Sequence, residues 1–256
     1  MSIPRLMAEK LFTTWKEKKN ANDIFPVDCI EIAKSLGIKV TSNDFKQAEF
    51  TGALFHKYGI NAIIFNSNIK EEGRKQFTIA HELGHYHLHF NSSNSTKPSS
   101  IENAGVIAQT SEGKKQEKEA NEFAACLLMP SEDMAPKLSN KVDMNLVIEL
   151  SKRYGTSITA TACRIVSLHE KPVGVVMLSK DNTTLWCYRN NHFRDFFIKK
   201  GKKINLESHA TQEQRECNAD LWLEKTKTNW KIKTSSIEME EYNKRLYIIT
   251  GEPNNN

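Results

Sequence analysis

The stretch FTIAHELGHYHLHF, residues 77–90, carries the strongest structural signal in the chain. Its positions 77, 80, 81, 84, 85 and 88 recur at helical spacing, so His81 and His85 fall on one stripe of a helix. A second apolar line, which includes Ile79 and Leu83, runs beside that stripe. The stretch therefore predicts a central helix near 71–89 that is covered on two sides and turns two histidines toward the interior.

Two buried imidazoles four residues apart suggest a metal site. Burying their polar nitrogens without a partner is costly, and one ion at roughly 2.0–2.1 Å can satisfy both. Glu82 lies beside His81, where it can take a proton from a metal-bound water, and the five residues match HExxH. The alternative is a pair of core histidines bonded to backbone or carboxylate groups. The pairing, the glutamate and the buried stripe together favour a metal.

A catalytic zinc also needs a third protein ligand and an open position. The next helix that bears carboxylates is predicted at 116–128, where it ends before Met129-Pro130. Glu117 and Glu119 enter the core end of its buried stripe from either side, and helical spacing alone does not choose between them. Either could instead be a solvated glutamate that the helix dipole favours in a first turn.

At this point the sequence resembles the ImmA/IrrE family of metallo-endopeptidases. The matching segments are RKQFTIAHELGH at 74–85 and EANEFAACLLMP at 119–130, supported by the hairpin that ends in Ile64-Phe65-Asn66. The turn Tyr154-Gly155-Thr156-Ser157 before a helix with Arg164 is similar too, so the resemblance covers roughly residues 25–170.

The resemblance implies a set of roles for this site. His81 and His85 would bind zinc, Glu119, directly before Ala-Asn, would be the third ligand, and Glu82 would be the general base. It also implies limited proteolysis of a partner protein, typically a helix-turn-helix transcriptional repressor, which derepresses stress-response or mobile-element genes.

Length and residue patterns predict an α+β fold in two parts. The 256 residues correspond to about 1.7 domains at roughly 150 residues each. We expect a zincin-like metallopeptidase domain at 1–170, including a helix-turn-helix-like segment at 143–169, and a smaller C-terminal α+β domain of unknown role at 171–256. Further expectations are helices at 4–19, 26–37 and 211–225, a hairpin at 50–65, a flexible loop at 91–100, and strands at 173–178, 184–188, 229–234 and 245–250.

The sequence also suggests a compartment. The five cysteines are widely spaced with no CxxC pair, which suits a reducing environment. No stretch approaches the roughly 20 apolar residues that a spanning helix needs, and the N-terminus lacks the apolar core of a signal peptide. We therefore expect a cytoplasmic protein without membrane partners.

Two other classes of function compete with the peptidase. A DNA-binding regulator would use the helix at 157–169 near Thr159 and Arg164, but Arg164 is its one cation, which suits packing better than phosphate contact. A protein-binding module could keep the zinc site without significant peptidase activity. The run Lys199–Lys203 could meet an acidic partner or nucleic acid, although such runs are more commonly solvated turns.

Overall fold

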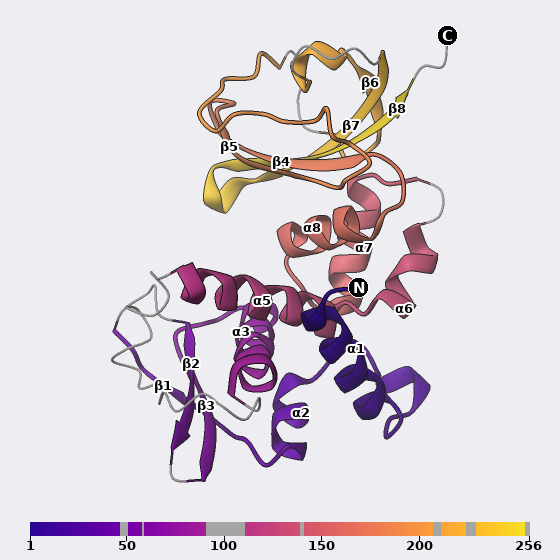
Figure 1. The fold of residues 1–256 in the computed structure, drawn as a ribbon. Coiled ribbons are helices and arrows are strands. Elements are labelled where there is room, and N and C mark those ends of the chain that lie inside the picture. Colours follow the sequence, from indigo (N-terminus) through magenta and orange to yellow (C-terminus); the bar gives the residue numbers. More distant parts are fainter. Residues whose placement is uncertain are drawn as a thin grey trace. The chain divides into compact units, whose positions relative to one another are not determined.

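The computed structural model describes residues 1–46, 51–57, 59–90, 111–138, 141–206, 211–223 and 229–253. Helices and two sheets are mixed in it, which confirms the predicted α+β class. Internal contacts divide the chain into two compact units (Figure 1). Unit 1 is Met1–Ser131 with Arg153–Ser157, and unit 2 is Glu132–Lys152 with Ile158–Asn256.

Unit 1 combines helices with a small three-stranded sheet. Its helices are α1 Ile3–Lys16, α2 Cys29–Ser35, α3 Glu72–His85 and α5 Ser111–Leu128, with a π-helical turn, Tyr86–Phe90, continuing α3. Its strands are β1 Lys39–Asn43, β2 Gly52–Lys57 and β3 Ile60–Asn66. The sheet order is β1-β3-β2, with β1 parallel and β2 antiparallel to β3.

The hairpin predicted at 50–65 is present as β2 and β3, whereas β1 was missed. Its residues, KVTSN, are mostly exposed and show no clean alternation of apolar and polar side chains. Pairing with β3, from Lys39 opposite Ala62 to Asn43 opposite Asn66, makes the segment a strand. Here a tertiary partner decides what local propensity does not.

Helix α3 is the centre of unit 1 and packs against both α5 and the sheet (Figure 1). Ile79 and Leu83 are fully buried, as predicted for a helix covered on two sides. Gly84 lets α5 approach closely, because a Cβ at this position would lie 3.1 Å from the Cα of Ala120 and 3.2 Å from its carbonyl oxygen. The missing side chain therefore allows α5 to pack closely against the helix that carries the histidines.

The turn Arg153–Ser157 belongs to unit 1. The Tyr154 ring is buried and meets the Phe25 ring edge-on, with centroids 5.1 Å apart, and the Arg153 guanidinium lies 4.7 Å above the Phe25 ring. Gly155 has φ +61° and touches the start of α3, because a Cβ on Gly73 would lie 2.3 Å from the Gly155 carbonyl oxygen. The turn thus supports the helix that carries HExxH.

Unit 2 is built around a five-stranded antiparallel sheet of order β5-β4-β8-β7-β6. Its strands are β4 Val173–Ser179, β5 Thr184–Arg189, β6 Arg215–Cys217, β7 Trp230–Met239 and β8 Lys244–Pro253. Its helices are α6 Ser131–Met134, α7 Met144–Tyr154, whose last two residues belong to unit 1, and α8 Ile158–Leu168. Helix α8 packs on β4 and β5.

The other face of this sheet carries a cluster of aromatic and aliphatic side chains, among them Phe193, Phe196 and Trp222. Ser235 on β7 meets the first turn of α7, where the Met144 N–H donates to its hydroxyl at 2.8 Å. This contact holds α7 beside the sheet and agrees with its assignment to unit 2.

The structure differs from the predicted helix at 211–225, and it groups the elements around residue 170 in another way than the predicted domains. The helix predicted at 211–225 is wrong in its described part, 211–223, because Arg215–Cys217 pairs with β7 as strand β6 and only a 3-10 turn follows, at Ala219–Leu221. The domain boundary near residue 170 stays a prediction, and the contact-based units divide the chain elsewhere, since α8 and most of α7 group with the C-terminal sheet.

The loop predicted at 91–100 lies outside the described residues. Within the described part of the chain, no helix combines the length and the apolar character that crossing a bilayer requires.

Candidate metal centre

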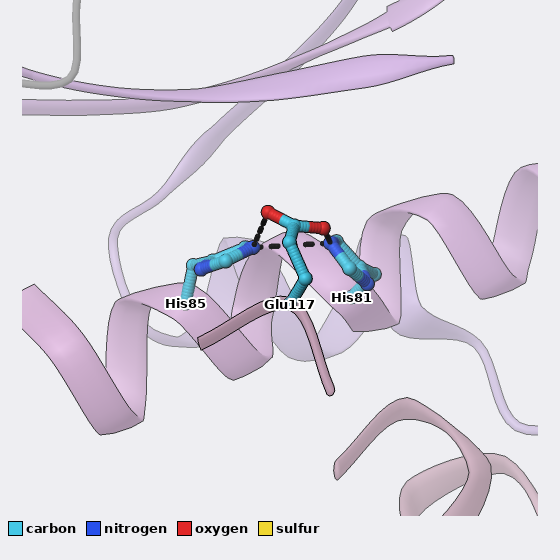
Figure 2. A group of neighbouring side chains, drawn as sticks. All are labelled: His81, His85 and Glu117. Carbon is cyan, nitrogen blue, oxygen red and sulfur yellow. Dashed lines mark hydrogen bonds and ion pairs between the residues drawn. The ribbon is translucent and has the colours of Figure 1, made fainter. Parts of the chain in front are cut away.

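Three side chains from two helices converge in unit 1. His81 and His85 lie one turn apart on α3, and Glu117 of α5 reaches between them (Figure 2). The Glu117 carboxylate is 3.3 Å from His81 Nε2 and 3.2 Å from His85 Nε2, and the two Nε2 atoms are 3.0 Å apart. Among the described residues, these three form the one group of histidine, cysteine or acidic side chains that could hold a metal ion.

The donor set and its spacing fit a divalent ion such as zinc. Ligands at ~2.0–2.1 Å from a tetrahedral zinc lie ~3.3 Å from one another. The three observed separations, 3.0 to 3.3 Å, are close to this value. Two neutral imidazoles and a carboxylate are also a common ligand set of catalytic zinc, which leaves one coordination position to water or substrate.

Asn121 orients the imidazole ring of His81. Its Oδ1 lies 3.1 Å from His81 Nδ1, and an amide oxygen can only accept a hydrogen bond. This hydrogen bond places a proton on Nδ1, so Nε2, which faces Glu117, is the nitrogen that can bind a metal when it gives up its own proton. Metal-binding histidines commonly donate their second N–H to such an oxygen, which fixes the ring.

Electrostatics keep Glu117 ionised. Hydrogen bonds with His81 and His85 hold the pKa of this carboxyl well below its usual range, against the opposing effect of burial. Burial by itself lowers the pKa of His81, but the hydrogen bond to Glu117 and the charge of Glu82 outweigh it, so the net shift is upward. An anionic carboxylate between two imidazoles is a suitable electrostatic environment for a cation.

Glu82 lies next to this group but faces the sheet. It is 7 % exposed, and burial raises its pKa, against the charges of His81 and His85, which lower it. Its carboxylate accepts the backbone N–H of Leu54 on β2. A carboxylate whose pKa is raised by burial is a stronger proton acceptor than an exposed one, which suits the predicted general base.

The structure does not bring Glu119 into the group. Its carboxylate lies 3.9 Å from His89 Nε2 and 4.0 Å from the Lys115 ammonium. A step of two residues turns a helix by about 200°, so Glu117 and Glu119 cannot share a face. The structure places Glu117, and not Glu119, beside the histidines, on a face of α5 that approaches α3 closely at Gly84 and Ala120.

Sequence reasoning missed Asn121 and the Leu54 amide. A signal for Asn121 was present, because it lies four residues after Glu117 and so on the same face of the helix. Glu119 lies only two residues before Asn121, so these two side chains point to different sides of the helix. The contact of the Leu54 N–H with Glu82 could not be predicted from the sequence, because every residue except proline carries a backbone N–H.

Comparison with known proteins finds a family model that matches the part of the chain with this site. A family model described as Peptidase_M78, IrrE N-terminal-like domain, matches residues 33–166, just over half of the chain. A Mycobacterium tuberculosis transcriptional regulator has a similar fold, with a TM-score of 0.57 and 14% sequence identity, over 96% of this chain and 75% of that one. No curated protein matches the chain.

Proposed function

The chain belongs to the IrrE N-terminal-like peptidase family, the family its motifs suggested, and from this premise we propose that it is a zinc-dependent endopeptidase. The observation that carries the proposal is the convergence of His81, His85 and Glu117 beside a buried Glu82. In this proposal the unit is zincin-like, with HExxH on one helix and the third ligand on a second. Bound there, the ion would supply Lewis acidity to the scissile carbonyl and to the attacking water.

The chain's own groups perform the proton transfers in this proposal. The Glu82 carboxylate takes a proton from the attacking water, and the same oxygen then gives it to the nitrogen of the leaving amine. Burial of Glu82 supports this role, because the raised pKa brings its basicity closer to that of the groups with which it exchanges the proton. The Leu54 N–H holds the carboxylate in place through both transfers.

Strand β2 supports an extended peptide as the substrate. It pairs only with β3 among the described strands, so its second edge is open to strand addition. The Leu54 N–H bonds the Glu82 carboxylate, so strand β2 passes directly beside the proposed base. An enzyme of this kind binds the substrate's backbone first and selects side chains second.

For the substrate we propose a helix-turn-helix transcriptional repressor, cleaved at a limited number of sites to derepress stress-response or mobile-element genes. This step rests on the family and on the regulator whose fold is similar. A DNA-binding role for α8 has less support, because Thr161, Arg164 and Ile165 are buried where the helix packs in unit 2.

The decisive experiment compares the wild type with Glu82→Gln in co-expression with candidate neighbouring repressors. We expect a defined fragment with the wild type and a loss of at least ~100-fold in cleavage rate with Glu82→Gln, because no proton acceptor remains. Glu149→Gln, an exposed glutamate on α7, is the matched control and should cleave normally. Equal cleavage by Glu82→Gln would disprove the mechanism, and zinc binding without any cleavage would favour a binding module.

A further inference from the structure

A strongly basic segment lies on the surface of unit 2. The segment Arg194–Lys203, sequence RDFFIKKGKK, carries five cationic side chains and one carboxylate. All five cations are exposed: Arg194, Lys199, Lys200, Lys202 and Lys203. No part of the metal centre or of the proposed hydrolysis uses this segment.

The segment is held rigidly against β5. Phe196 and Ile198 are buried in the core cluster and anchor its first half. In its second half the Gly201 N–H donates to the Thr184 carbonyl at 2.8 Å, and the Thr184 N–H donates to the Lys202 carbonyl at 2.9 Å. Gly201 adopts φ +87°, the left-handed turn that glycine favours. The four lysines are thus displayed from a fixed backbone.

The positive charge of this segment is only partly offset by neighbouring carboxylates. Asp195, its one carboxylate, accepts the Trp230 indole N–H at 2.9 Å. Asp181, in the neighbouring turn, accepts hydrogen bonds from Ser179 and Thr183, which hold its pKa below the usual range, and the charge of Lys203 lowers it further. Lys203 is therefore the one cation of the segment that the structure places under the influence of a described carboxylate outside it. In the part of the chain that the structure describes, no carboxylate lies within ion-pair distance of the five cations.

An exposed aromatic ring adjoins the lysines. Phe197 is 54 % exposed, although its neighbours Phe196 and Ile198 are buried. Exposure alternates along the segment, with Phe196 and Ile198 buried and Phe197 and Lys199 exposed. Leaving a phenyl ring in water forgoes the gain from burying it, so a partner that covers the ring would recover that free energy.

We propose that the segment Arg194–Lys203 binds single-stranded nucleic acid. The lysines contact backbone phosphates, and a base stacks on the Phe197 ring. Single strands fit better than a duplex, whose bases are already stacked and leave the ring unused. They also fit better than an acidic peptide, which matches the charge but not the ring. The inference goes beyond the proposed peptidase and does not depend on the metal centre.

The test measures binding of a fluorescein-labelled oligothymidine to the full chain by anisotropy over a range of salt concentrations. In one variant Lys199, Lys200, Lys202 and Lys203 are all replaced by Gln. In the matched control four exposed lysines of unit 1 are replaced by Gln, namely Lys10, Lys18, Lys34 and Lys39. Both variants change the net charge equally, so they separate a local site from general attraction to a basic protein.

The segment variant should bind the oligothymidine at least ~10-fold more weakly. The slope of log K against log salt concentration should also become shallower by up to about 3, because each of the four lost phosphate contacts contributes ~0.7 to that slope. Phe197→Ala should weaken binding by several-fold to ~100-fold and leave that slope unchanged. The control should match the wild type.

Equal binding by the segment variant and the wild type would overturn the proposal. Competition by duplex DNA or by polyglutamate as effective as that by the single strand would overturn it too. Metal content and peptide cleavage are measured on the same preparations, so a failure here is distinguishable from a failure of the proposed function.

Discussion

At the scale of single residues, the histidines and Glu82 could be predicted because HExxH fixes them relative to one another within one helix. The third donor could not, because Glu117 and Glu119 enter the same end of α5 and differ only in rotation about its axis. The resemblance implied Glu119, whereas the geometry places Glu117 between the imidazoles.

Replacing each glutamate separately distinguishes the two. Glu117→Gln should lose stoichiometric zinc after dialysis, because the group loses its anionic ligand, while Glu119→Gln should retain it. Metal content per chain by elemental analysis is the measurement. The reverse pattern would restore Glu119 as the ligand and show that α5 has a different rotation in the metal-bound protein.

Asn121 provides a second test at this scale. Asn121→Ala removes the acceptor that holds His81 Nδ1–H, and we expect a loss of ~10–100-fold in zinc affinity in competition with a chelator. Asn121→Asp keeps an acceptor oxygen and should rescue the affinity. If alanine and aspartate behave alike, Asn121 has no role in orienting the imidazole.

At the scale of elements, most helices and strands followed from periodicity, since long stripes on α3 and α5 and alternation in the hairpin are strong local signals. The errors fell on edge segments. Strand β1 was missed and the segment with β6 was predicted as a helix, because both are short edge strands stabilised by pairing with a neighbour.

The close packing of α3 against α5 predicts how Gly84→Ala, which adds one methyl group, changes the stability of the protein. Alanine is the better helix former by ~1 kcal/mol, which favours Gly84→Ala. The new Cβ would, however, lie 3.1 Å from the Ala120 backbone, and overpacking of this kind costs ~1–3 kcal/mol. We expect the free energy of unfolding to fall and zinc affinity to weaken as α5 shifts. A rise in stability by denaturant titration would mean that α5 moves away at no cost.

At the scale of the whole molecule, the chain passes out of unit 1 after Ser131 and returns for the turn Arg153–Ser157. Tyr154→Ala should therefore loosen unit 1, where the ring is 1 % exposed, at a cost of ~3–5 kcal/mol typical of a buried aromatic. Hydrogen exchange should accelerate in α3 and remain slow in β4 and β8. Equal acceleration in both units would show that they unfold together.

The sequence by itself determined the α+β class, the central helix, the histidine pair and its glutamate, because each depends on spacing within a single element. Only the tertiary structure decided that Glu117 and not Glu119 joins the histidines, that Asn121 and the Leu54 amide contact His81 and Glu82, and that α8 groups with the C-terminal sheet. The physical reason is that the rotation and approach of one element against another depend on packing, as at the close approach of α3 and α5 at Gly84, and the periodicity within one element does not specify how it packs against another.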